Sequence, residues 1–141
     1  MPVYTLVYSS VPESEDQMIN DLDRIMTANR VDTDIRRCIS LAVSEAFANA
    51  VTHGNLQNPA KLVKIDLQVN KSEIIADVRD EGRGGLERIK ARKPAAPLAE
   101  SGRGIDLMKH SVSSVDFRES DSGGLIVSIR LVRQTEQKMN G

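Results

Sequence analysis

The chain has 141 residues, a formal net charge of −1 and a hydrophobic fraction of 40%. This length suits one domain with a single core, and the near-neutral charge argues against a general binder of polyanions. The two Tyr and two Phe, with no Trp, are too few aromatic platforms to recognise single-stranded nucleic acid by base stacking. We therefore expect one globular domain that does not bind nucleic acid directly.

The sequence carries no sign of export or membrane insertion. Its single cysteine, Cys38, cannot form an internal disulfide, and no charged-then-apolar leader opens the chain. No apolar run approaches the roughly 20 residues that cross a bilayer. We expect a cytoplasmic protein with no membrane contact.

Charge is distributed unevenly along the chain. Residues 13–34 contain seven acids and two bases, whereas residues 79–103 contain seven bases and four acids. Two solvated faces would explain both segments equally well. The sharper interpretation is an anion site in the basic segment and part of a partner surface in the acidic one.

A strand and two helices are predicted first. Residues 3–8 alternate loosely, with β-branched and aromatic side chains, and predict a strand. Residues 13–29 and 34–53 carry apolar side chains at helical spacing, and the second range has the broader apolar stripe. Gly54 follows at a position where a helix C-terminus favours glycine.

An antiparallel strand pair and a glycine-rich segment come next. Residues 63–69 alternate between apolar and polar, and residues 74–78 repeat the pattern after a short link. From residue 82 to 104 the periodicity fails and Gly and Pro accumulate. This predicts a lid at about 85–103, with at most a short helix over 86–92.

The rest of the chain predicts a short helix, a hairpin and a polar tail. The helix is expected at 105–112, the hairpin at 115–118 with 125–132, and the tail at 133–141. The order of elements predicts an α+β fold, a two-layer α/β sandwich with a mixed, mainly antiparallel sheet and helices on one face. We expect residues 1–132 to form this single domain.

The first chemical motif lies on the longest predicted helix. Glu45, Asn49 and His53 are spaced four residues apart, so they would share one ridge at the border of the apolar stripe. A carboxylate and an amide at that border would be partly shielded from water and still accessible to a ligand. A solvated polar face is the structural alternative.

Two glycine motifs follow. Asp80-Glu81-Gly82-Arg83-Gly84 comes directly after a predicted strand, where glycines permit positive φ and close approach to a ligand. Gly102-Arg103-Gly104-Ile105 opens a predicted helix, whose free N–H groups and dipole favour phosphate. Each alone is also explained as a turn or as a glycine before a helix.

In this order, the three motifs closely resemble those of the ATP-binding superfamily shared by DNA gyrase, MutL and the sensor histidine kinases, which has the Bergerat fold. The short length and the runs SEAFANAVTHG (residues 44–54) and SGRGI (residues 101–105) resemble the bacterial anti-sigma-factor serine kinases. The resemblance covers residues 3–132.

The resemblance implies ATP and Mg²⁺ as ligands and assigns roles to the motif residues. Asn49 would coordinate Mg²⁺, a hard cation that suits an amide oxygen. Asp80 would accept a hydrogen bond from the adenine amino group, with Gly82 and Gly84 close to the nucleotide. The residues holding the phosphates beneath the lid would be Gly102, Arg103 and Gly104, with the adjoining Ile105.

The resemblance also implies a reaction and partners. Glu45 would be the general base that takes the proton of an attacking serine hydroxyl, and His53 would fix the helix end. The partners would be a sigma factor and an anti-anti-sigma protein of the STAS type, and a homodimer is compatible with the family.

Two features depart from the family pattern and keep alternatives open. Asn55 follows His53-Gly54 where an aromatic residue is frequent, and the lid segment, with Ala91, Ala95 and Ala96, is poor in hydroxyl side chains. A non-catalytic, nucleotide-responsive switch is therefore the second hypothesis. The ATP-binding half of a sensor histidine kinase is a third, disfavoured because no helix pair with an acceptor histidine precedes the motifs.

Overall fold

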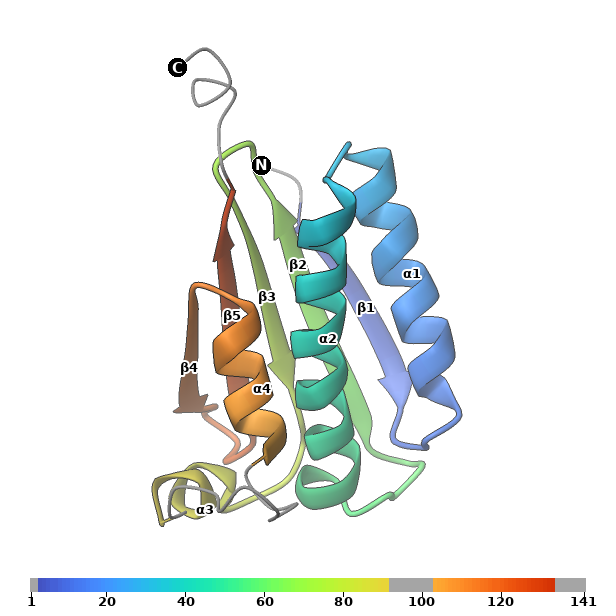
Figure 1. Cartoon of the computed structure of the whole chain (residues 1–141). Coiled ribbons are helices and arrows are strands. Elements are labelled where there is room, and N and C mark those ends of the chain that lie inside the picture. The colour runs from blue at the N-terminus through green and yellow to red at the C-terminus, as the bar shows by residue number, and fades with distance from the viewer. Residues whose placement is uncertain (1–2, 92–102, 134–141) are drawn as a thin grey trace.

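The computed structural model describes residues 3–91 and 103–133 (Figure 1). The strands are β1 (Val3–Ser9), β2 (Leu62–Val69), β3 (Glu73–Arg79), β4 (Ser114–Glu119) and β5 (Leu125–Val132). The helices are α1 (Ser14–Ala28), α2 (Thr33–Asn49), α3 (Gly85–Ala91) and α4 (Arg103–Ser111), with a π-helical turn, η1 (Ala50–Gly54), after α2.

The five strands form one sheet in the order β1-β2-β3-β5-β4. Each pairing among the described residues is antiparallel, so the parallel component allowed by the expected mixed sheet is not found there. The connections explain this. Two helices, α1 and α2, lie between β1 and β2, and each runs the length of the sheet in the opposite direction to the element before it, so β2 runs antiparallel to β1. β3 and β4 run in the same direction, but β5 lies between them.

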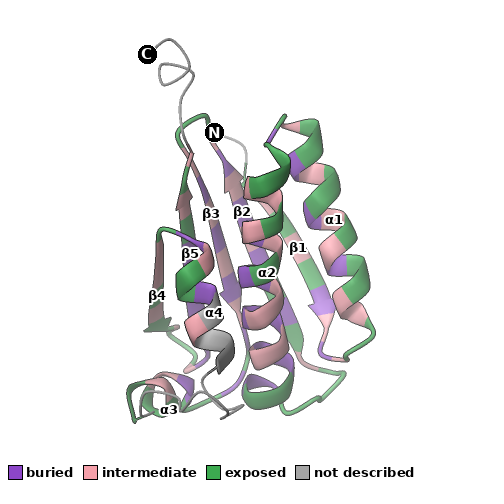
Figure 2. Cartoon of the chain, viewed as in Figure 1, coloured by how far each residue is buried: buried purple, intermediate pink, exposed green. Residues whose placement is uncertain are grey.

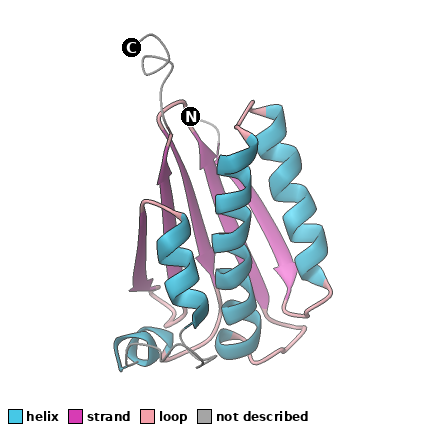
Figure 3. Ribbon diagram, in the orientation of Figure 1, coloured by secondary structure: helices cyan, strands magenta, loops and turns pink. Residues whose placement is uncertain are grey.

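Helices α1, α2 and α4 cover one face of the sheet, as the predicted two-layer sandwich requires (Figures 1 and 3). Figure 2 marks the buried residues along these helices and the strands that they cover. The largest fully buried ones include Met18, Leu22 and Met26 of α1, Ile39, Val43 and Phe47 of α2, and Ile65, Leu67, Ile74 and Ile129 of the sheet. Their spacing of four residues in the helices and two between Ile65 and Leu67 belongs to the periodicity that predicted these elements.

The other face of the sheet is mixed: it carries paired polar side chains as well as the exposed Val3, Val7, Leu62 and Val132. Asp66 of β2 accepts a hydrogen bond from Thr5 at 2.8 Å and pairs with Arg79 at 3.4 Å. Asp77 of β3 accepts one from Ser128 at 2.6 Å. These polar groups pair with one another across neighbouring strands, as is usual on the solvent-facing side of an antiparallel sheet.

Tyr8 of β1 contacts both α1 and α2. Its ring packs edge-on against Phe47 of α2, with centroids 5.9 Å apart. Its hydroxyl donates to Oδ2 of Asp21 in α1 at 2.6 Å. Burial, and then the adjacent Asp21 carboxylate, raise the pKa of Tyr8. The residue thus fixes α1 and α2 relative to β1.

The predicted lid is described only in part. Its first portion forms α3 at Gly85–Ala91, close to the short helix expected there, and α4 begins at Arg103. The predicted segment 92–102 and the tail beyond Arg133 lie outside the described residues. No helix within residues 3–91 and 103–133 is both long and apolar enough to cross a membrane.

Candidate functional site

The end of α2 carries the first predicted motif. Glu45 and Asn49 lie on this helix and are half-buried, as expected for the border of the apolar stripe, whereas His53 is exposed. The α-helix ends at Asn49, and His53 lies in the π-helical turn η1 that follows it. His53 is therefore more exposed than Glu45 and Asn49, although it stays on the predicted segment.

Hydrogen bonding defines this π-helical turn. The N–H of Asn55 donates to the carbonyl of Ala50, five residues back, at 2.7 Å. Gly54 ends the helical segment, as expected, but it is buried and is not among the residues with positive φ. A contact with the next motif is what requires a glycine at this position.

Asp80 is the centre of that second motif. It is 5% exposed and directly follows β3. Its Oδ1 accepts hydrogen bonds from the N–H of Gly82 at 2.9 Å and from the N–H of Leu125 at 3.0 Å. Its Oδ2 makes no hydrogen bond to any of the described residues. One carboxylate oxygen is thus fixed by the backbone while the other remains available as an acceptor.

Three glycines allow the backbone to close around Asp80. A Cβ on Gly54 would lie 2.1 Å from Oδ2 of Asp80, and one on Gly82 would lie 2.1 Å from the carbonyl oxygen of Gly54. A Cβ on Gly124 would lie 2.2 Å from the carbonyl oxygen of Asp80. Gly84 serves differently, since its φ is +71° and open space surrounds its Cα.

Sequence reasoning found three of these four glycines but not Gly124. Gly124 precedes β5, and Leu125 is joined to Asp80 by both backbone groups, since the N–H of Asp80 donates to the carbonyl of Leu125 at 3.1 Å. The pair Gly123-Gly124 in the last hairpin was the only signal available. A turn explains such a pair locally, so its contact with Asp80 had no separate signature.

The third motif is described only at its helical end. α4 begins at Arg103 and packs against α2 on the same face of the sheet (Figure 1). Its first turn, the Asp80 turn and the end of α2 all lie at one end of the molecule (Figure 1). Gly102 lies outside the described residues, as do the side chains of Arg103 and Ile105, and Gly104 is placed only as part of the helix.

A second carboxylate approaches the predicted base. Burial raises the pKa of Glu15, and so, to a smaller extent, does repulsion from Asp16 and Glu45. Glu15 is in the first turn of α1, which begins at this same end of the sheet. Glu45 therefore sits in an acidic corner formed by the ends of two helices.

The residues present suit a nucleotide with its magnesium ion. Oδ2 of Asp80, which accepts no hydrogen bond from the described residues, could accept one from the amino group of a planar base lying against the glycine turns. No group of three or more His, Cys, Asp and Glu side chains that could hold a metal exists in the part of the chain that the structure describes. Mg²⁺ needs no such cluster, because it binds through few protein ligands together with phosphates and water.

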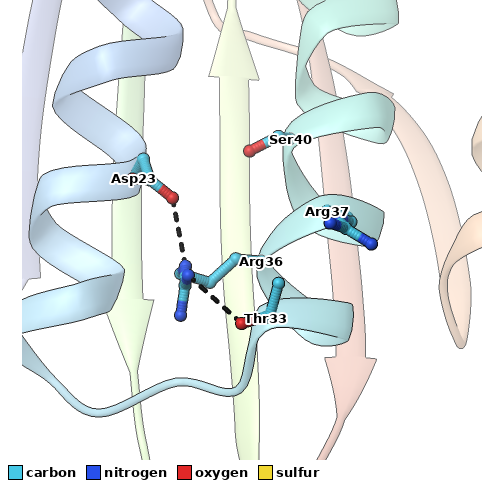
Figure 4. A pocket seen from close by; sticks show the side chains of 5 residues that line it. All are labelled: Asp23, Thr33, Arg36, Arg37 and Ser40. Carbon is cyan, nitrogen blue, oxygen red and sulfur yellow. Dashed lines mark hydrogen bonds and ion pairs between the residues drawn. The ribbon is translucent and has the colours of Figure 1, made fainter.

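A separate pocket of about 180 Å³ lies at the opposite end of α2 (Figure 4). Its central side chain, Arg36, donates to Asp23 at 3.0 Å and to the carbonyl of Val31 at 2.6 Å. Arg36 thus joins the start of α2 to α1, and its donors are engaged within the fold. Nine residues separate it from Glu45, roughly 13 Å along the helix axis, so this pocket is distinct from the predicted site.

Comparison with known proteins places the chain in a family. The model of the histidine kinase-like ATPase domain matches residues 8–131, and the chain belongs to this family. A crystal structure of the RsbU and RsbW domains of Rv1364c from Mycobacterium tuberculosis has the same fold, with a TM-score of 0.69 and 16% identity over 96% of this chain and 34% of that chain.

Among curated proteins, the chain is similar to several anti-sigma F factors. That of Bacillus cytotoxicus is 30% identical over 95 residues, covering 64% of this chain and 65% of the relative. That of Heyndrickxia coagulans is 29% identical, covering 62% and 63%, and that of Clostridium perfringens is 34% identical, covering 63% and 67%. The match to the first two spans less than two thirds of their length. The resemblance indicated by the three motifs is confirmed.

Proposed function

We propose that this protein is an ATP-binding anti-sigma factor and serine-protein kinase. It sequesters a sigma factor and phosphorylates a serine of an anti-anti-sigma partner of the STAS type. The observation that carries the proposal is the contact of Gly54 with Asp80, because it joins the Glu45–Asn49 helix to the first glycine turn at one site. The names of the curated relatives support the sigma factor as partner.

In this proposal Asp80 recognises adenine. Its Oδ1 is held by two backbone N–H groups, so Oδ2 has a fixed direction and accepts from the adenine amino group. Gly82 and Gly84 keep side chains away from the base. In this proposal Gly102, Arg103, Gly104 and Ile105 hold the phosphates, because free N–H groups at the start of a helix favour anions.

Glu45 is the proposed catalytic base, and Asn49 the proposed magnesium ligand. The serine hydroxyl of the partner attacks the γ-phosphorus of ATP, Glu45 takes the hydroxyl proton, and ADP leaves with the bonding electrons. Bound Mg²⁺ would neutralise charge on the phosphates. The half-buried setting of Glu45 restricts water while leaving the carboxylate reachable.

Incubation with Mg-ATP and candidate anti-anti-sigma proteins tests the reaction. We expect phosphoserine on the partner by mass spectrometry. Glu45→Gln should slow transfer by roughly 10²–10⁴-fold, the usual contribution of a positioned base, without abolishing ATP binding. Transfer by this variant at the wild-type rate would show that the assigned base is wrong.

The non-catalytic switch remains the second candidate because the segment between the glycine motifs is poor in hydroxyl side chains. It uses ATP only to change the affinity for a partner. Tight Mg-ATP binding that alters partner affinity, with no phosphate transferred, would favour it over the kinase. An unchanged partner affinity with and without ATP would exclude it.

A further inference from the structure

Asn55 is a buried polar residue that the proposed chemistry does not use. It directly follows η1, and its side chain and backbone together are only 1% exposed. Burying an amide side chain is unfavourable unless its donors and acceptor find partners. The partners of Asn55 therefore indicate what the residue does.

Its side chain makes three hydrogen bonds to three separate segments. Nδ2 donates to Oγ of Ser10, beyond β1, at 2.7 Å and to the carbonyl of Leu62, at the start of β2, at 3.0 Å. Oδ1 accepts from the N–H of Glu81 at 2.7 Å. These partners fix the orientation of the amide, because a flipped side chain would set its NH₂ group against the N–H of Glu81.

The third bond acts on the candidate site. Glu81 follows Asp80, and a second bond restrains the same residue, since its Oε1 accepts from the N–H of Leu62 at 2.8 Å. The Asp80-Glu81 turn is thus attached to the start of β2 both directly and through Asn55. Asp80 can select a ligand only if its backbone is held in place, because selection depends on a fixed direction of the carboxylate oxygen.

We propose that Asn55 is a positioning residue that holds the Asp80 carboxylate in place for the base of the nucleotide, and so sets the preference for adenine over guanine. The proposal rests on the ATP-binding part of the proposed function and not on kinase activity. The family resemblance leads one to expect an aromatic side chain here, and a phenylalanine would have no acceptor for the N–H of Glu81. This chain fixes its nucleotide turn by a hydrogen-bonded amide instead.

Ser10 supplies a matched control. Its hydroxyl donates to the carbonyl of Lys61 at 2.7 Å and accepts from Asn55, so Ser10→Ala removes buried bonds from the same network. It leaves the bond from Glu81 to Asn55 in place. A merely structural role for Asn55 would make Asn55→Ala and Ser10→Ala similar in every property.

The test is calorimetric titration of the full chain and both variants with Mg-ATP and with Mg-GTP, alongside melting temperatures. We expect Asn55→Ala to reduce the ratio of ATP to GTP affinity by about tenfold, the effect of one lost buried hydrogen bond. Ser10→Ala should lower the melting temperature and leave the ratio unchanged. An unchanged ratio in Asn55→Ala, with the wild type binding ATP, would overturn this inference alone. A wild type that binds neither nucleotide would overturn the proposed function as well.

Hydrogen exchange on the wild-type protein tests the proposal even where Asn55→Ala does not fold. The amide of Glu81 belongs to an exposed residue outside the helices and strands, yet it donates to a buried acceptor. Slow exchange of this amide without nucleotide supports the proposal. Exchange at the rate of an unprotected amide would overturn it.

Discussion

Gly54 lies directly against the carboxylate of Asp80, with room for hydrogen but not for a methyl group. A Cβ on Gly54 would stand 2.1 Å from Oδ2 and 2.5 Å from Cγ of Asp80. The carboxylate cannot easily turn away, because its Oδ1 already accepts from two backbone N–H groups. The helix end and the first glycine turn are therefore packed directly against each other.

This contact makes Gly54→Ala a direct test of the site. The added methyl must displace the Asp80 carboxylate or open the junction, so ATP affinity should fall by at least about tenfold and stability by about 1–3 kcal/mol, as for overpacking elsewhere. Titration calorimetry and urea denaturation measure the two effects. Thr52→Ala, at an exposed position of the same turn, is the control. ATP binding by Gly54→Ala equal to wild type would contradict the proposed site.

Asp80→Asn should change the base that the site prefers. An asparagine can keep an oxygen facing the N–H groups of Gly82 and Leu125, which places NH₂ where Oδ2 stands. This group opposes the adenine amino group and suits the carbonyl of guanine. We expect Mg-ATP affinity to fall roughly 10–100-fold and Mg-GTP affinity to fall less or rise.

The matched control for that substitution is Asp77→Asn. Asp77 lies on β3, the strand that Asp80 follows, but on the face of the sheet without helices, where Ser128 and Arg118 pair with it. This variant should lose some stability and keep the nucleotide preference of the wild type. A similar loss of ATP affinity in both variants would mean that Asp80 acts through the fold and not through the base.

The sheet and its helical layer were predictable because each strand and helix has one apolar face that can be recognised in the sequence. Val63, Ile65 and Leu67 alternate with polar residues, so β2 can bury only one side. Met18, Leu22 and Met26 do the same for α1 at helical spacing. Such periodicity is local, so it can be read without knowing which elements meet.

The construction of the site was less predictable because it depends on contacts between distant segments. Leu125 is bonded to Asp80, and Asn55 is bonded to both Ser10 and Glu81, although none of these pairs is close in sequence. None of these three hydrogen bonds leaves a periodic pattern in the sequence. The π-helical turn η1 likewise had no separate signature, because residues 50–54 continue the apolar and polar pattern of the preceding helix.

Tyr8→Phe should lower stability without affecting the site directly. It removes the 2.6 Å bond to Asp21 but keeps the ring contact with Phe47. Because the acceptor is charged and partly buried, we expect a loss of about 1–2 kcal/mol in urea denaturation. Tyr4→Phe, on the same strand, removes a longer bond of 3.2 Å from Asn29 and should cost less. Equal losses of stability would mean that the bond from Tyr8 to Asp21 stabilises the fold no more than the bond from Asn29 to Tyr4.

Glu15 should make the protein less stable as the pH rises above its ordinary titration range. Burial, Asp16 and Glu45 raise its pKa above 4.5 in the folded state, so the fold binds this proton more tightly than the unfolded chain. That contribution is fully present below pH 4.5 and is lost as the pH rises through the raised pKa. At neutral pH the ionised side chain therefore opposes folding.

Glu15→Gln should consequently be more stable than wild type at pH 7 and lose that advantage at pH 4. The gain should stay below about 1 kcal/mol, because Glu15 is partly exposed and an acid in the first turn also interacts favourably with the helix dipole. Urea denaturation at the two pH values measures the difference. Glu13→Gln, which removes an exposed carboxylate next to the same helix, should show no such pH-dependent gain. If Glu15→Gln is instead less stable than wild type at pH 7, the dipole outweighs repulsion and the acidic corner does not strain the fold.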